Sequence, residues 1–359
     1  NMDEKPIVVG ITQGDINGIG YEVIIKTLTD ARMLEICTPV IYGSSKVTSY
    51  HRKLIKNSGD FSFQVISKPE QISTKRTNIF DLTEKEIKIE IGKSTAIAGE
   101  MALASLEMAT EHLAQGKIDV LVTAPINKYN IHSETFAFAG HTEYLAQKYN
   151  SDNYLMLMIT ERLKIGTVTT HCAISEVPKI LRRNLIKNKL EILATALQCD
   201  FMCTKPRIAV LSLNPHAGEN GMFGKEEQNA IIPVIKEAYS QGIYAFGPFA
   251  ADGFFGSGQY VKYDGVLAMY HDQAMIPFKL LSDEKGVNYT GGLPFIRTSP
   301  AHGTAYEIAG KDLASPDSFR EAIYWACDIF RNRKQNQYPD EQNDEQNDEQ
   351  NKEINITTT

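Results

Sequence analysis

Short apolar runs alternate with longer amphipathic segments along most of the chain. Seven runs have the length of strands, and those from residue 118 onward lack polar alternation, as strands covered on both faces do. Amphipathic patterns between them predict helices. This alternation predicts α/β layers around mostly parallel sheets. The predicted strands are 6–12, 38–43, 118–126, 154–159, 164–171, 207–214 and 264–270, and the predicted helices are 18–28, 94–115, 176–198, 225–240 and 316–334.

Two segments give the clearest local predictions. Ser94 to Gln115 is rich in Ala and Met, with Ser94 as the predicted N-cap and Gly116 as the terminator. The stretch 265–281, GVLAMYHDQAMIPFKLL, reads as a buried strand that runs into a buried helix. Three polar residues, His271, Asp272 and Gln273, stand at the junction, where they either cap a turn or form the floor of a site.

Composition limits the classes of protein that fit. The chain has 359 residues, 42% of them hydrophobic, which favours two domains with a large core. Residues 335–359 hold seven acids and one lysine, so they carry −6 of the net −7 and leave −1 for the remainder. The remainder of the chain has no strongly basic region, so its charge does not indicate a nucleic-acid partner. The DEQN repeats of 335–359 have almost nothing to bury, so this tail is expected to be disordered or an isolated helix.

Location is also constrained by the sequence. No run approaches the eighteen apolar residues needed to span a bilayer, and the N-terminal residues lack the basic region of a signal peptide. The five cysteines form no CxxC pair. Such a count predicts reduced thiols in a cytoplasmic protein without a membrane segment.

Three of the eight histidines directly follow predicted strands. They are His171 in VTTHCA, His216 in LNPHAG and His271 in AMYHDQ. Ligands of α/β proteins gather outside the carboxyl ends of strands, and three neutral imidazoles with an open position form a catalytic divalent-metal site. The alternative is that each histidine closes a loop separately by hydrogen bonding, and the sequence leaves both interpretations open.

A second group of residues suits an anion. His141 and Thr142 stand where a loop enters a helix, and a helix N-terminus favours phosphate. The alternative is a Thr142 N-cap beside a surface histidine. Arg297 and Lys279 supply positive charge, although Lys279 equally suits a side chain that reaches the surface. The glycine-rich stretch 14–22, GDINGIGYE, lacks a complete G-x-G-x-x-G and is rejected as a Rossmann signal.

Seven motifs together resemble the 4-hydroxythreonine-4-phosphate dehydrogenase family of vitamin B6 biosynthesis, over roughly residues 6–334. In order they are GDINGIGYE, VTAPINK, GHTEYLA, TTHCAI, LNPHAGENGMFGKEE, LAMYHDQAMIPFK and VNYTGGLPFIRTSPAHGTAYEIAG. The resemblance implies two α/β/α domains with a cleft between them, similar to isocitrate and isopropylmalate dehydrogenases, and not a Rossmann fold. The implied divisions are 2–140 plus 286–334 with the cofactor loop, 141–285 with the metal and phosphate site and dimer contacts, and the tail 335–359.

The resemblance also implies roles for individual residues. A homodimer with active sites at its interface is implied, in which one metal ligand comes from the other subunit. The implied ligands of one divalent ion (zinc, magnesium or cobalt) are His171, His216 and His271. The implied substrate-binding residues, chiefly around the phosphate, are His141, Thr142, Lys279, Asn288 and Arg297. The implied orienting or proton-accepting residues are Asp252 and Asp272, and those of the NAD or NADP loop are His302 and Gly303.

One motif departs from the family. Its first block usually reads GDPAGIGPE, whereas Ile16, Asn17 and Tyr21 replace two prolines and an alanine here. This departure puts the rigidity of the first turn in doubt, while the metal and phosphate positions are intact.

The implied reaction is the oxidation of 4-phosphooxy-L-threonine by NAD or NADP. The product, 2-amino-3-oxo-4-phosphooxybutanoate, then loses carbon dioxide to give 3-amino-2-oxopropyl phosphate, in the biosynthesis of pyridoxine 5'-phosphate. A dehydrogenase of threonate or erythronate 4-phosphate on the same scaffold is the first alternative. A three-histidine metallohydrolase is the second, but it leaves HGTAYEIAG unexplained.

Overall fold

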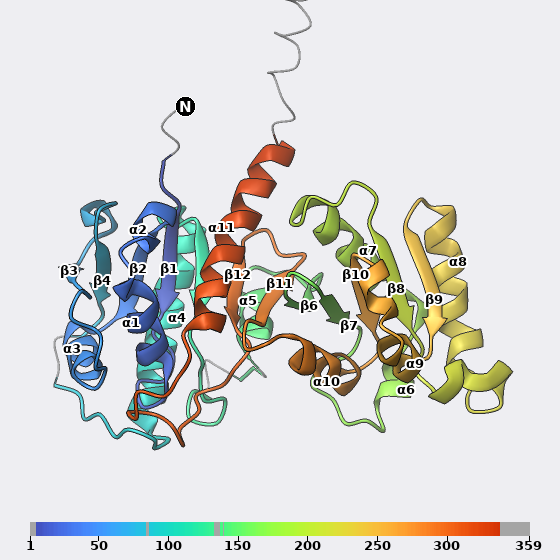
Figure 1. Cartoon of the computed structure of the whole chain (residues 1–359), viewed down its shortest axis with the longest axis horizontal. Helices are drawn as coiled ribbons and strands as arrows, with labels where there is room; N and C mark the ends of the chain where they lie inside the picture. Colours follow the sequence, from blue (N-terminus) through green and yellow to red (C-terminus); the bar gives the residue numbers. More distant parts are fainter. Residues whose placement is uncertain (1–4, 84–85, 133–136, 139, 338–359) are drawn as a thin grey trace, which may run out of the picture.

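The structure is a computed structural model that describes residues 5–83, 86–132, 137–138 and 140–337. Within these residues one mixed sheet of twelve strands extends across the molecule (Figure 1). In the order of the sheet, the strands are β3 (Phe63–Ile66), β4 (Thr77–Asp81), β2 (Thr38–Gly43), β1 (Val8–Thr12), β5 (Val120–Thr123), β12 (Arg297–Pro300), β11 (Val287–Gly291), β6 (Leu155–Ile159), β7 (Lys164–Thr167), β10 (Gly265–Ala268), β8 (Arg207–Leu211) and β9 (Tyr244–Phe249).

Helices cover both faces of this sheet (Figure 1). Their bounds are α1 (Gly20–Thr29), α2 (Met33–Ile36), α3 (Ser45–Lys53), α4 (Ala96–Ala114), α5 (His141–Lys148), α6 (Val177–Ile180), α7 (Arg183–Cys199), α8 (Ile232–Ser240), α9 (Ala251–Gly256), α10 (His271–Leu281) and α11 (Asp317–Gln337). Shorter helical turns are η1 (Pro69–Gln71), η2 (Pro215–Gly221), η3 (Glu227–Ile231) and η4 (Gln259–Lys262). Among the described residues no helix is long and apolar enough to cross a membrane.

The predicted α/β class is confirmed. All seven predicted runs contain a strand of the sheet. Its pairings are parallel from β3 to β12 and again from β7 to β9, whereas β11 and β6 run antiparallel to their neighbours. Helix α4 is capped by the Thr95 side chain, which accepts from the Ala98 N–H, so the prediction of Ser94 as the N-cap was wrong by one residue. The five cysteines are free thiols.

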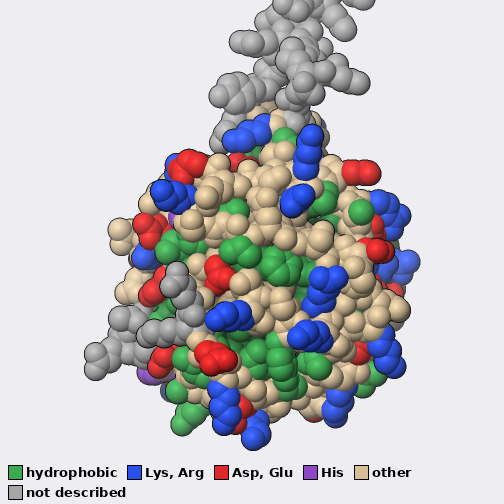
Figure 2. Space-filling view, turned by 90° about the vertical axis from the view of Figure 1, so that its left-hand side faces the viewer, with side chains coloured by type: hydrophobic (Ala, Val, Ile, Leu, Met, Phe, Trp, Pro, Cys, Tyr) green, Lys and Arg blue, Asp and Glu red, His purple; other side chains and the backbone are tan. Residues whose placement is uncertain are grey.

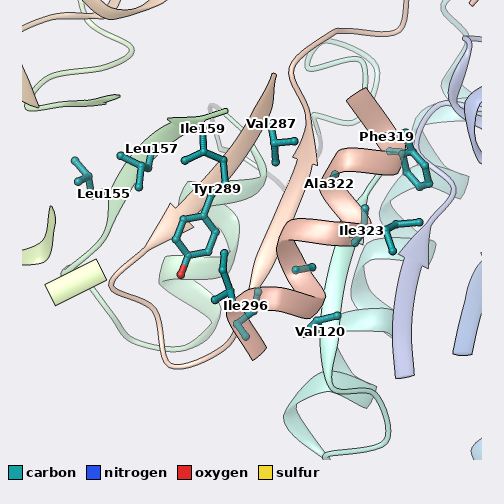
Figure 3. Packing of buried hydrophobic residues seen from close by; sticks show 14 of the residues in the cluster. Val120, Leu155, Leu157, Ile159, Val287, Tyr289, Ile296, Phe319, Ala322 and Ile323 are labelled. Atoms are coloured by element: carbon teal, nitrogen blue, oxygen red, sulfur yellow. The ribbon is translucent and has the colours of Figure 1, made fainter. Parts of the chain in front are cut away.

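The two faces of the sheet are filled differently. Alternate residues of a strand point to opposite faces, so Val120 and Val122 of β5 join one apolar cluster while Leu121 joins another. The first cluster continues along that whole face, through Tyr289 of β11 and Ile323 of α11 (Figure 3). The opposite face holds two separate clusters, one over β1, β2 and β5 and one over β6, β7, β8 and β10.

Polar side chains occupy the gap between those two clusters. Asn288 and Thr290 alternate with the core residues Val287 and Tyr289 along β11, and therefore face the gap. Arg297 of the adjacent strand β12 is also buried there, with 3% of its surface exposed. The gap thus marks where a ligand site interrupts the core.

The division into two domains stays a prediction. The predicted boundaries at residues 140–141 and 285–286 do not coincide with a break in the sheet. The sheet is continuous, and β12 and β11 lie at its centre. Helix α11 continues to Gln337, three residues into the range expected as the tail, and residues 338–359 lie outside the described residues. On the face that carries the β3 edge, basic and acidic side chains are interspersed (Figure 2).

The unusual first turn is held by hydrogen bonds. The buried Asn17 side chain donates to the Lys93 carbonyl (2.9 Å) and to Thr95 Oγ1 (3.1 Å). Its Oδ1 accepts from the Glu90 N–H (2.9 Å). Asn17 therefore joins the first turn to the segment that precedes α4 and to the cap of that helix.

The other two replaced positions are also anchored. The Ile16 carbonyl accepts from Nε2 of His51 (2.7 Å), and the His51 ring stacks on Tyr21 at 5.1 Å between centroids. The Tyr21 hydroxyl donates to Gln13 Oε1 and accepts from the Ser44 N–H (3.2 Å). These contacts of Ile16, Asn17 and Tyr21, here called the hub, thus hold the turn where the resembling family usually has prolines.

We predict that Asn17→Ala lowers the free energy of unfolding by about 1–3 kcal/mol, because it removes a buried amide together with its three hydrogen bonds to partly buried groups. Urea denaturation followed by circular dichroism measures the change. The exposed Asn57→Ala is the matched control and should stay within about 0.5 kcal/mol of the parent. Equal stability of the two variants would show that the hub does not restrain the turn.

Candidate functional site at the centre of the sheet

A cavity of about 240 Å³ opens over the gap in the core. Its walls come from the loop after β5, the start of α5, the loop after β7, the start of α10, and strands β11 and β12. These segments are far apart in sequence, and several lie just past the carboxyl ends of strands, as the strand-end rule predicts. Eight of the predicted site residues line the cavity: His141, Thr142, His171, His271, Asn288, Arg297, His302 and Gly303.

Arg297 is the dominant charge of the cavity. It donates to Thr123 Oγ1 from Nε (3.0 Å) and from Nη2 (2.8 Å), and more weakly to the hydroxyls of Thr142 and Thr290 (3.4 and 3.5 Å). It forms no ion pair within the described part of the chain. Burial lowers its pKa to about 10, which still leaves the guanidinium charged at neutral pH. A buried charge whose hydrogen-bond partners are all hydroxyls favours an anionic ligand.

His141 and Thr142 begin helix α5 beside Arg297. Gly140 is the N-cap residue, Thr142 lies inside the helix, and His141 is 9% exposed. The alternative of a Thr142 N-cap beside a surface histidine is therefore wrong. Burial, followed by repulsion from Arg297 and Lys128, lowers the pKa of His141 well below its usual value, so the ring is neutral at pH 7.

Unpartnered polar atoms accompany this charge. Three residues that line the cavity have buried side-chain atoms without a hydrogen-bond partner: His141 Nε2, Asn288 Oδ1 and His302 Nε2. His302 uses its other nitrogen, Nδ1, to donate to the Gly303 carbonyl (3.1 Å). Buried polar groups are normally paired, so three in one cavity indicate positions that a ligand satisfies.

His171 and His271 lie side by side at the cavity wall, with ring centroids 6.2 Å apart. Nδ1 of His171 is 3.0 Å from Glu143 Oε1, and Nδ1 of His271 is 2.8 Å from Asp272 Oδ1. In a neutral imidazole the nitrogen bonded to a carboxylate carries the proton. Each ring therefore keeps Nε2 as a lone-pair donor, the form in which imidazole binds a metal ion.

His216 is held apart in a left-handed turn. His216, Ala217, Glu219 and Asn220 of η2 all have φ between 42° and 56°, a region that L-residues rarely adopt. The buried Glu227 fixes the start of this turn, because its Oε1 accepts from the N–H groups of Leu213 and Asn214 (both 2.8 Å). Backbone strain of this kind is common in segments that take part in function, and here a buried carboxylate holds the strained turn in place.

The remaining predicted residues lie away from the cavity. Asp252 and His216 line a neighbouring depression of about 280 Å³, which also includes Tyr270. Asp272 and the two paired histidines line another of about 480 Å³. Lys279 is exposed on α10. Within the described residues no cluster of three His, Cys, Asp or Glu side chains is placed to hold a metal ion.

Two charged residues of the cavity were not singled out from the sequence. Glu143 lies in the first turn of α5, and Lys128 follows β5. Burial alone would raise the pKa of Glu143, but hydrogen bonds from His171 and from a backbone N–H outweigh it, so the pKa is lowered and the carboxylate is charged. Glu143 lies within the motif GHTEYLA and Lys128 within VTAPINK. Their place in these motifs is the sequence feature that could have identified them as site residues.

Comparisons with known proteins agree with the resemblance. A family model described as pyridoxal phosphate biosynthetic protein PdxA matches residues 35–326. A 4-hydroxythreonine-4-phosphate dehydrogenase of Bacteroides thetaiotaomicron is 52% identical over 94% of this chain and 92% of its own length. A D-threonate 4-phosphate dehydrogenase of Cupriavidus necator is 36% identical over 92% of this chain and 100% of its own.

A solved structure shows the same fold. The crystal structure of 4-hydroxythreonine-4-phosphate dehydrogenase from Klebsiella pneumoniae superposes with a TM-score of 0.79 at 34% identity. The match covers 91% of this chain and 99% of that chain. The fold class predicted from the sequence is confirmed by this agreement.

We predict that Arg297→Met leaves the ligand-free protein at least as stable as the parent, because it removes an unpaired buried charge and keeps an apolar stem. Inorganic phosphate should raise the melting temperature of the parent and not that of the variant. Thermal melts over a range of phosphate concentrations measure both effects.

The matched control is Arg331→Met, which removes an exposed arginine paired with Asp328. It should keep the stabilisation by phosphate. An Arg297→Met variant that phosphate stabilises as strongly as the parent would contradict the assignment of Arg297 as the anion-binding group.

Proposed function

The chain belongs to the PdxA family of pyridoxal phosphate biosynthetic proteins, and on that premise we propose that it is an NAD(P)-dependent dehydrogenase of 4-phosphooxy-L-threonine. The observation that carries the proposal is the buried, unpaired Arg297 guanidinium, which shares one cavity with the histidine pair His171 and His271. A phosphate handle and a metal-binding wall within one cavity suit a small phosphorylated hydroxy acid.

In this proposal the phosphate group occupies the Arg297 end of the cavity. Arg297 supplies the charge, Thr142 a hydroxyl, and the first turn of α5 its free N–H groups. The unpartnered Nε2 of His141 is proposed to donate to a phosphate oxygen, whereas the unpartnered Asn288 Oδ1 is an acceptor and suits a hydroxyl or ammonium group of the substrate. Binding energy from this remote group positions the reacting carbon near the two histidines.

The residues fit a divalent metal ion, because both His171 and His271 present Nε2 with Nδ1 held by a carboxylate. His216 is the proposed third ligand. A divalent ion bound there would lower the pKa of the substrate hydroxyl and stabilise negative charge after oxidation. Asp272 orients His271, and Asp252 lies with His216, so both aspartates are proposed to position ligands or accept the hydroxyl proton.

The loop that begins at His302 is the proposed cofactor site. A nicotinamide cofactor bound there would accept the hydride from the carbinol carbon. Gly303 has open space around its Cα, so a ligand can approach its backbone closely. The loop is fastened to the first turn by the Ile19 N–H, which donates to the Thr304 carbonyl (2.9 Å), and by the Tyr306 hydroxyl, which donates to Asp15 (2.6 Å).

The oxidised product would be a 3-oxo acid, which loses carbon dioxide readily because the electrons of the broken bond pass into the ketone. The chain's contribution to this step is electrostatic: the two histidines would hold the ion that stabilises negative charge on the ketone oxygen, while Arg297 keeps the phosphate in place. The product would be 3-amino-2-oxopropyl phosphate.

A homodimer is proposed to complete the site. Each histidine segment carries exposed apolar side chains nearby: Ile174 after His171, Met222 after His216, and Ile276 and Leu280 after His271. Burial of such side chains against a second copy would offset their exposure to water. The same contact would bring His216 and Lys279 of one subunit to the cavity of the other, which they do not reach within a single chain.

The second candidate substrate is D-threonate 4-phosphate, because a relative at 36% identity carries that name. D-threonate 4-phosphate has the same phosphate and carboxylate groups as 4-phosphooxy-L-threonine, but it carries a different group next to the reacting carbon. The Arg297 site would bind either substrate.

We predict that His171→Ala and His216→Ala each abolish turnover and lower the bound metal, because each removes a ligand. If the two ligands of one site come from different subunits, an equimolar mixture refolded together should regain about a quarter of parental turnover. Half of the dimers would then be mixed, and each would hold one intact site. A mixture that stays inactive while mixed dimers form would place both ligands in one subunit.

We also predict faster reduction of NAD or NADP with 4-phosphooxy-L-threonine than with D-threonate 4-phosphate, and loss of turnover when a chelator removes the metal. Absorbance of the reduced nicotinamide measures both. Faster turnover of the sugar acid would favour the second candidate. Release of inorganic phosphate without a nicotinamide would instead indicate the metallohydrolase.

A further inference from the structure

We infer that Glu143 is a positioning residue that fixes the tautomer and the orientation of His171. The inference rests on the proposed function, because His171 is a metal ligand only within that proposal. The observation is the bond between His171 Nδ1 and Glu143 Oε1, 3.0 Å long, at the wall of the cavity. Neither the motif pattern nor the family resemblance had assigned a role to Glu143.

The same arrangement recurs at the neighbouring ligand. Asp272 Oδ1 accepts from His271 Nδ1 at 2.8 Å, and the two imidazoles lie 6.2 Å apart. Two adjacent histidines thus use the same nitrogen for a carboxylate and leave the same nitrogen, Nε2, for a ligand.

Glu143 is the better-fixed of the two carboxylates. Its side chain is 23% exposed, against 69% for Asp272. It belongs to the first turn of α5, whose preceding residues His141 and Thr142 lie at the Arg297 end of the cavity. Asp272 follows His271 directly and moves with it, whereas Glu143 reaches His171 from a different element. Glu143 therefore ties the anion-binding helix start to the histidine that follows β7.

This connection has a chemical consequence. With Nδ1–H donated to the carboxylate, His171 keeps its Nε2 lone pair for the ligand position. Loss of the carboxylate would free the ring to rotate and to adopt the opposite tautomer. Metal affinity should then fall by about 10- to 100-fold.

A purely structural role for Glu143 makes a different prediction. An acid in the first turn stabilises a helix through its dipole, by about 0.3–1 kcal/mol. Asp317 is likewise an acid in the first turn of a helix, α11, where it pairs with Arg320 (3.0 Å), and it does not line the cavity, so it serves as the control. If Glu143 acted only on the helix, Glu143→Ala and Asp317→Ala would change stability alike and leave His171 unaffected.

The first measurement is made on the metal-free protein with ¹⁵N-labelled histidine. Two-dimensional NMR distinguishes the Nδ1–H from the Nε2–H tautomer, and His171→Ala assigns the signal. We expect Nδ1–H at His171 in the parent and in Asp317→Ala, and a shift toward the Nε2–H form in Glu143→Ala. An unchanged tautomer in Glu143→Ala, or an Nε2–H form in the parent, would overturn the inference.

The second measurement is the dissociation constant for Co²⁺, from competition with a chromophoric chelator. We expect a 10- to 100-fold weaker constant for Glu143→Ala, a smaller change for Glu143→Gln, whose amide oxygen still accepts, and the parental value for Asp317→Ala. Parental affinity in Glu143→Ala would overturn the inference and leave the proposed function standing. A parent that binds no metal would overturn the metal part of the proposed function itself, while the NMR arm still decides the role of Glu143.

Discussion

The arrangement of the molecule depends on one buried charge that forms no ion pair with the described residues. Arg297 sits at the centre of a twelve-stranded sheet with hydroxyl groups as its partners. An apolar core cannot close over such a group, so the core is continuous on one face of the sheet and divided on the other. The cavity, the unpartnered polar atoms and the start of α5 all lie in that division. The protein gives up some stability at this point, which the proposed anion would restore on binding.

The sequence predicted seven of the twelve described strands, chiefly apolar and regular ones, and missed β3, β4, β9, β11 and β12. Strands such as β5 and β10 were found because every residue is buried, and the strand-end position of His271 followed from β10. Strands β11 and β12 were missed because VNYTG and RTSP carry polar residues that face the cavity. A strand with one polar face at a buried site looks like a loop in the sequence, since periodicity shows which residues alternate and not what covers them.

Residue roles were predictable only where a motif or a strand end marked them. Eight expected residues meet in one cavity, but His216, Asp252, Asp272 and Lys279 lie outside it in a single chain, and spacing along the sequence holds no information about a second chain. Glu143 and Lys128 were not singled out, because a charged residue in a helix start or a loop is usually solvated. Their function depends on side-chain direction, which is decided by tertiary packing.

The hydrogen-bonded hub around Asn17 has a consequence for temperature. Proline stiffens a turn by restricting the unfolded chain, an entropic effect whose weight grows in proportion to absolute temperature. Asn17 stiffens the same turn through hydrogen bonds to Lys93, Thr95 and Glu90, whose contribution is largely enthalpic. Two proteins of this family can therefore share one turn geometry and differ in how it softens on heating. A chain with Ile16, Asn17 and Tyr21 is therefore expected to soften at this turn earlier on heating than a relative with prolines at the first and last of these positions.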